Sequence, residues 1–233
     1  MDELLEYLQE IGFEDLYLPR ARGPAESSSR AHPEAAGSVT SKSPEERLGC
    51  LAELEMESRD CTLCDLSRGR QKVVFGSGDP DADLMFIGEG PGAEEDRQGV
   101  PFVGRAGELL TKIIQAIGLE REQVYIANIV KCRPPGNRDP QSEEVAACRR
   151  YLEQQIDLIE PKIIVLLGRV AAQTLLGNDL TLGRMRKQWH RVREVEARVT
   201  YHPAALLRNS SFKRPTWEDM QAVRDRLAEA SVG

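Results

Sequence analysis

One stretch, residues 83–110, constrains the fold more than any other: DLMFIGEGPGAEEDRQGVPFVGRAGELL. Its apolar residues 84–87 form a short run that predicts a buried strand, and the run ends in a turn with three glycines in five residues. Four carboxylates belong to this turn or follow it, at Glu89, Glu94, Glu95 and Asp96. A strand that ends in a glycine turn usually opens a site at the carboxyl edge of an α/β sheet. We therefore expect the functional site here.

A dinucleotide-binding turn is the alternative interpretation of these glycines. It is disfavoured because the third glycine of G-x-G-x-x-G is missing, Pro91 has no amide donor, and the acids would repel a phosphate. Farther along, Pro101-Phe102-Val103-Gly104 exposes an aromatic side chain beside a helix start. The apolar spacing predicts that this helix continues from Gly107 until Gly118 closes it.

Predicted strands alternate with predicted helices along the rest of the chain. Apolar or extended segments predict further strands at residues 124–130, 163–167 and 191–200. Helices are predicted at residues 44–59, 141–158, 169–176 and 216–229, the first with Ser43 as its N-cap. This order predicts an α/β fold of three layers, α/β/α, with a central, mostly parallel four-stranded sheet.

The N-terminal end differs in composition from this domain, which we assign to residues 45–233. Residues 1–19 carry apolar side chains at near-helical spacing and predict a short amphipathic helix. Residues 20–44 are rich in Ser, Pro, Gly and Ala, and they predict a flexible linker because they offer almost nothing to bury. Whether the helix docks on a protein partner or folds back on the domain is open.

The net charge of −7 is unevenly divided. Residues 1–60 hold 6 basic and 14 acidic side chains, whereas residues 61–233 hold 25 and 24. Within the latter, residues 181–226 hold 11 basic and 5 acidic side chains, which suits contact with phosphates. No signal peptide or membrane-length apolar run is present, so we expect a cytoplasmic protein without membrane contact. We also expect a monomer, because the predicted elements leave no strand edge or apolar helix face obviously unpaired.

Four of the five cysteines form a pattern. Cys61 and Cys64 are a C-x-x-C pair, and Cys132 and Cys148 follow at a distance, which leaves Cys50 as an ordinary helix residue. Disulfides are disfavoured in the cytoplasm, and a redox pair would leave two cysteines unexplained. The four thiolates predict a metal site, and the spacing alone does not choose between zinc and an iron–sulfur cluster.

Two further places add candidate site residues. Asn128 lies near the end of the second predicted strand, where its amide offers a donor and an acceptor to the edge of a base. His202 follows the last extended segment, and an apolar tip with Leu206, Leu207 and Arg208 comes directly after it. In a basic region, such a tip resembles a wedge that opens a duplex.

Together these motifs resemble the family 4 uracil-DNA glycosylases, the iron–sulfur class of the uracil-DNA glycosylase superfamily. The matching pieces are GEGPGAEED with GVPFVG, then NIVKCRPPGNR, then HPAALLR, with the cysteines in the family's order. The resemblance covers residues 45–230. It implies a monofunctional enzyme that flips uracil out of single- or double-stranded DNA and hydrolyses its N-glycosidic bond, which leaves an abasic site during base excision repair.

The resemblance also implies roles for individual residues. Cys61, Cys64, Cys132 and Cys148 would hold a [4Fe–4S] cluster with a structural role. Phe102 would stack on the extruded uracil, and Asn128 would hydrogen-bond its Watson–Crick edge. His202 would sit at uracil O2. The lining of the pocket would come from Glu89, Gly90 and Gly92, while Glu95 would occupy the space of a thymine methyl group, and residues 204–208 would enter the minor groove.

The motifs leave one catalytic role and one alternative function open. Other branches carry an aspartate where this chain has Gly90, so either Glu89 or Glu95 orients the water, and we favour Glu89. The loop at residues 131–140 has no histidine, which disfavours covalent trapping of uracil. A non-catalytic module that binds damaged DNA, or acts in replication, is the alternative to an enzyme. A zinc-stabilised nucleotide-binding protein is a third candidate.

Overall fold

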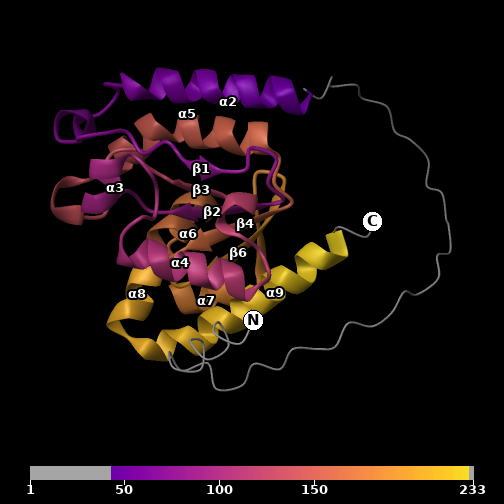
Figure 1. Cartoon of the computed structure of the whole chain (residues 1–233). Helices are drawn as coiled ribbons and strands as arrows, with labels where there is room; N and C mark the ends of the chain where they lie inside the picture. Colours follow the sequence, from indigo (N-terminus) through magenta and orange to yellow (C-terminus); the bar gives the residue numbers. More distant parts are fainter. Residues whose placement is uncertain (1–42, 231–233) are drawn as a thin grey trace.

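The computed structural model describes residues 43–230 (Figure 1). The predicted N-terminal helix and the linker lie outside the described residues, apart from Ser43 and Pro44. Ser43 caps the first described helix as expected: its hydroxyl accepts from the amide of Glu46, whose carboxylate accepts in turn from the amide of Ser43. Within this part of the chain, no helix is long and apolar enough to cross a membrane.

The centre of the fold is one sheet with strand order β1-β3-β2-β4-β6-β5. Its four inner strands run parallel: β2 (Leu84–Gly88), β3 (Tyr125–Asn128), β4 (Ile163–Leu167) and β6 (Val195–Thr200). This confirms the predicted α/β class and its parallel centre. Two short antiparallel edge strands complete the sheet, β1 (Ser77–Gly78) beside β3 and β5 (Trp189–Val192) beside β6.

The second edge strand explains one wrong prediction. The segment 191–200, expected as one extended strand, is part of a hairpin in which β5 turns into β6 at Arg193. Arg193 takes a left-handed conformation there, with φ of 48°. The sequence hides this turn, because Arg193 is neither glycine nor asparagine, the residues that usually signal such a conformation.

Helices cover both faces of the sheet (Figure 1), and the side chains of β2 point alternately to one face and to the other. Met85 and Ile87 pack with α2 (Pro44–Arg59), α5 (Ser142–Ile159) and α6 (Arg169–Leu176). Leu84 and Phe86 point to the opposite face and pack with α4 (Arg105–Ala116), α8 (Pro203–Arg208) and α9 (Lys213–Ala230). Figure 1 shows α2 and α5 on one side of the sheet and α4 and α9 on the other. The three predicted layers are therefore present.

The short helices escaped prediction. α3 (Ala93–Gln98) buries only Asp96, and α7 (Leu182–Arg186) has five residues, so neither offers an apolar period to detect. The remaining short turns of helix are η1 (Asp65–Arg68), η2 (Arg121–Gln123), η3 (Pro135–Asn137) and η4 (Ser210–Phe212). α9 begins at Lys213, three residues before the predicted start, because Pro215 fits the first turn of a helix.

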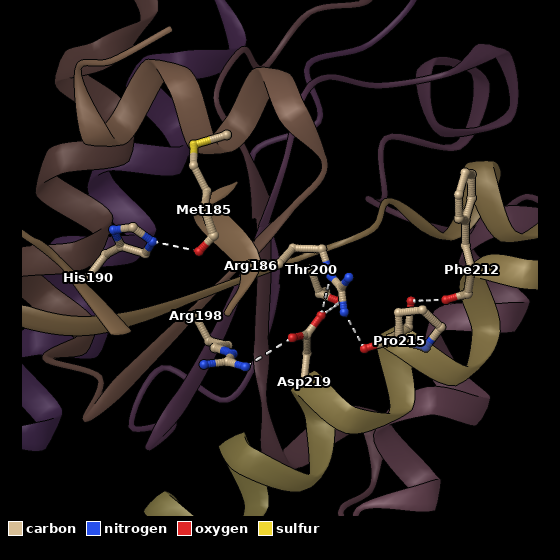
Figure 2. Close-up of polar contacts among 9 residues, drawn as sticks. Met185, Arg186, His190, Arg198, Thr200, Phe212, Pro215 and Asp219 are labelled. Atoms are coloured by element: carbon tan, nitrogen blue, oxygen red, sulfur yellow. Dashed lines mark hydrogen bonds and ion pairs between the residues drawn. The ribbon is translucent and has the colours of Figure 1, made fainter. Parts of the chain in front are cut away.

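A buried polar cluster joins α9, β6 and α7 (Figure 2). The carboxylate of Asp219 accepts hydrogen bonds from Arg186 Nε at 2.7 Å, Thr200 Oγ1 at 2.8 Å and Arg198 Nη2 at 3.1 Å. The Arg186 guanidinium also lies 4.5 Å from the ring centroid of Tyr201. The cluster therefore fixes the end of β6 and the residue directly before His202.

Candidate active site

A cavity of about 670 Å³ opens at the carboxyl edge of the sheet. Each parallel strand delivers a residue to it: Glu89 after β2, Asn128 in β3, Gly168 after β4 and His202 after β6. Of the residues expected in the site, those that line the cavity are Glu89, Gly90, Gly92, Glu95, Phe102, Asn128, His202 and Arg208. Since ligand pockets usually measure about 300–1,000 Å³, the cavity has room for a nucleoside.

Asn128 and Phe102 meet over the last residue of β2. Asn128 is 1% exposed and pairs in register with Gly88. A Cβ atom on Gly88 would lie 2.5 Å from Asn128 Oδ1 and 2.7 Å from Phe102 Cζ, both closer than real contacts allow. Glycine at this position thus lets an amide and an aromatic ring share the floor of the cavity.

If the activity is the uracil excision that the sequence resemblance implies, we expect Gly88→Ala to lower its single-turnover rate by at least about ten-fold, because the new methyl group displaces both side chains. Gly49 provides the matched control, since a Cβ atom there meets nothing within 4 Å. Gly49→Ala should leave excision unchanged. Equal rates for the two variants would contradict this description of the cavity floor.

The loop that carries Phe102 is held by Glu95. Its Oε1 accepts hydrogen bonds from the amides of Val103 and Gly104, each at 2.9 Å. Phe102 itself takes a left-handed conformation, with φ of 52°, and is only 7% exposed. The expectation of an exposed aromatic was therefore wrong, because the loop folds the ring inward. Glu95 therefore both lines the cavity and holds this loop in place through its two hydrogen bonds.

His202 stands opposite Phe102, with ring centroids 5.4 Å apart. It is the N-cap of α8, and its Nδ1 accepts from the amide of Ala204 at 3.1 Å. Burial and, to a smaller extent, the nearby charge of Arg208 lower the pKa of His202 to about 4, against the opposing charge of Glu95. The imidazole is therefore neutral near pH 7, and because Nδ1 is an acceptor, the proton resides on Nε2.

Glu89 lines the cavity and has a carboxyl group whose pKa is well above its ordinary value. Burial and, to a smaller extent, the charge of Asp139 raise its pKa to about 7, against the opposing charge of Arg169. Asp139 and Arg169 form an ion pair of 2.7 Å at the rim of the cavity. A carboxyl group with this pKa can take up or release a proton near neutral pH, as a general base must.

Asp139 and Arg169 were not singled out from the sequence. Asp139 lies near the end of the Pro- and Gly-containing loop at residues 131–140, and Arg169 is the first residue of α6. Two other residues of that loop, Asn137 and Arg138, also line the cavity. The only signal was the position of both segments after parallel strands, which places them at the same edge of the sheet.

The apolar tip after His202 is a helix and not a loop, because Pro203 occupies its first position and His202 caps it. Only one of its two leucines faces outward: Leu207 is 46% exposed, whereas Leu206 is 2% exposed and packs in the core with α4. Leu206 was therefore wrongly expected at the DNA surface. Arg208 is exposed and lines the cavity.

The four patterned cysteines line one second, small cavity between the α2–η1 region, the end of β3 and α5. All are free of disulfides. The Sγ of Cys132 accepts from Arg70 Nη1 at 3.3 Å, and the Sγ of Cys148 accepts from the amide of Lys131 at 3.2 Å. Within residues 43–230, no three His, Cys, Asp or Glu side chains are arranged to hold a single metal ion.

Known proteins resemble this chain along the same domain. The model of the uracil DNA glycosylase superfamily matches residues 75–221. A type-4 uracil-DNA glycosylase of Sulfurisphaera tokodaii is 44% identical over 184 residues, which cover 75% of this chain and 84% of that protein. One of Thermotoga maritima is 44% identical over 172 residues, or 71% of this chain and 88% of that protein. The chain therefore belongs to the uracil DNA glycosylase superfamily, in its type-4 branch.

Proposed function

We propose that the protein removes uracil from DNA by hydrolysing the bond between uracil N1 and the deoxyribose C1′. The observation that carries the proposal is Asn128, whose buried Oδ1 has no hydrogen-bond partner among residues 43–230. An unpaired buried acceptor costs about 1–3 kcal/mol, so this position suits a ligand that donates. Uracil N3–H is such a donor, and the adjacent O4 can accept from Nδ2 of the same amide.

Base recognition requires that the uracil leaves the helix. Extrusion costs a few kcal/mol and is easiest for a mispaired base, such as uracil opposite guanine. We assign stacking on the extruded base to Phe102 and the filling of the vacated space to Leu207, the exposed leucine of α8. Arg208, beside Leu207 and at the cavity, is suited to a phosphate contact.

The leaving group develops negative charge as the bond breaks, because the bonding electrons move to uracil N1 and O2. The Nε2–H of neutral His202 is the donor that we assign to O2. A donor that is already oriented stabilises the transition state more than the ground state. The uracil anion takes up a proton from solvent on release.

The sugar develops positive charge and is attacked by water. We assign Glu89 to this step: its carboxylate orients the water and accepts a proton as the water oxygen bonds to C1′. Glu95 is the less suitable base, because its Oε1 already accepts two amide hydrogen bonds. We retain for Glu95 the role of excluding the methyl group of thymine.

We propose that Cys61, Cys64, Cys132 and Cys148 hold a [4Fe–4S] cluster. The donor set fits, because four thiols surround one cavity and two of their sulfurs accept hydrogen bonds. Four thiols are also a donor set for a single zinc ion, and the metal content of the purified protein distinguishes the two. The bound cluster would cross-link segments distant in sequence. Free thiols in such a site fit the reducing cytoplasm, where we place the protein.

For the cluster, we expect the purified protein to be brown and to contain iron and acid-labile sulfide. Cys132→Ser should lose most of the iron and lower the melting temperature, because the metal site contributes to folding. Cys50→Ser is the control, since Cys50 lies on α2 and lines a different cavity. A colourless wild-type protein that contains zinc would contradict the proposal.

The activity itself is tested with a labelled oligonucleotide that holds one uracil opposite guanine, followed by alkali to cleave abasic sites. We expect cleavage of the uracil strand, single-stranded or paired, and none of a thymine control. A folded protein that binds this oligonucleotide without cleavage would instead support the non-catalytic, damage-binding alternative. The monomeric state and a partner for the N-terminal helix remain predictions.

A further inference from the structure

Lys131 is a buried lysine for which the proposed chemistry has no use. Its side chain is fully enclosed, with the residue 1% exposed, and Nζ donates to the backbone oxygen of Asn128 at 2.9 Å and to Gln155 Oε1. Gln155 is fixed in turn, because its Nε2 donates to Phe75 O at 3.0 Å and to Tyr125 Oη at 3.1 Å. Burying an amino group without gain is costly, so a lysine here calls for an explanation.

The other end of the same residue belongs to the cysteine cavity. The Lys131 amide donates to Cys148 Sγ at 3.2 Å, and the next residue is Cys132. Lys131 also lines that cavity, together with all four patterned cysteines. One residue thus contacts the wall of the cysteine cavity through its backbone and the base-recognition residue through its side chain.

The position of the contacted carbonyl explains what the lysine does. β3 ends at Asn128, and beyond it the amides of Ile129 and Val130 donate to the carbonyls of Gly88 and Glu89, at 3.0 and 3.3 Å. Lys131 Nζ donates a hydrogen bond to the Asn128 carbonyl at the point where the chain leaves the strand. This bond restrains the backbone of Asn128, and the backbone sets the direction in which the side chain points.

We propose that Lys131 is a positioning residue that holds Asn128 in its uracil-binding orientation and links this orientation to the cysteine cavity. The inference rests on the proposed function. Lys131 itself is too deeply buried to touch DNA or the base. Its effect on the base therefore passes through its bond to Asn128, and it should appear in the rate of excision and not in the affinity for DNA.

The test is a double-mutant cycle measured by single-turnover excision. Lys131→Met, which keeps the length of the side chain but removes the donor, should slow excision about ten-fold and leave DNA affinity unchanged. In an Asn128→Ala background the same change should have no further effect. Lys131→Gln, which can still donate to the carbonyl, should recover part of the rate, and it provides a second variant if methionine impairs folding.

The matched control is Tyr125→Phe, which removes a hydroxyl group from the same buried network but leaves the bond between Lys131 and Asn128 in place. It should keep the wild-type rate. Hydrogen exchange measured by mass spectrometry gives a readout independent of activity and of iron content: Lys131→Met should speed exchange in residues 126–131 but not in residues 163–167. A wild-type rate for Lys131→Met, or an equal loss in both backgrounds, would overturn the inference. An inactive wild type would refute the proposed function. The exchange data would still show whether Lys131 restrains the backbone of Asn128.

Discussion

Asn128→Ala should reduce single-turnover excision of uracil by about 10²- to 10³-fold, the effect of removing one well-placed polar group from an enclosed site. The wild-type amide is buried at the end of β3, and its Oδ1 has no partner among the described residues. Without the amide, the N3–H and O4 groups of uracil would enter the cavity unpaired, which costs free energy in the transition state. Gel analysis of alkali-treated product measures the rate directly.

Asn137→Ala is not a suitable control for this prediction, because Asn137 lines the same cavity. Asn178→Ala is preferable, since Asn178 lies beyond the end of α6 and outside the cavity. It should excise uracil at the wild-type rate. Asn128→Ala with activity close to that of wild type would show that another group recognises the base.

The second large effect concerns Glu89 and pH. With a pKa of about 7, the Glu89 carboxyl group is protonated at pH 5.5 and ionised at pH 8.5. Because the carboxylate is the active form, the excision rate should rise about ten-fold per pH unit below pH 7 and level off above it. His202 adds no change in this range, since its pKa is about 4. Glu89→Gln should lower the plateau by about 10²- to 10⁴-fold and flatten the profile.

Burial is the largest cause of the raised pKa of Glu89, and Asp139→Asn tests the second cause, a neighbouring charge. The negative charge of Asp139 raises the pKa of Glu89, so its removal should move the midpoint of the profile to lower pH. Glu94→Gln is the control: Glu94 is exposed, pairs with Arg97 and does not line the cavity, so the midpoint should stay in place. A wild-type rate that does not change through pH 7 would remove Glu89 from the role of base.

Much of the fold was predictable because strong local patterns agree with the tertiary structure. All five residues of β4, the run IIVLL, are buried as the pattern predicts, and the capping residues of α2 mark the start of that helix. The place of the site was predictable as well, since four parallel strands end at one edge and the motifs follow their ends. Glu89, Asn128 and His202 meet there although 113 residues separate the first from the last.

Other features depend on tertiary contacts that leave no local signal. The inward turn of Leu206 follows from how α8 packs on α4, and a six-residue helix has too few positions to show which face is buried. The amide bonds to Glu95 join residues eight and nine positions apart across a loop. Lys131 belongs to a loop whose sequence predicts exposure. Its burial depends on its contact with Gln155 of α5, which is itself bonded to Phe75.

The most direct test is to incubate the purified protein with a duplex that holds one uracil opposite guanine and to measure all products by mass spectrometry. Hydrolysis at the cavity predicts one free uracil for each strand that gains an abasic sugar, with the sugar–phosphate backbone intact and no protein attached to DNA. Asn128→Ala should yield almost none. Uracil that stays in the DNA although the folded protein binds the duplex, or a covalent protein–DNA product, would contradict the proposed hydrolysis.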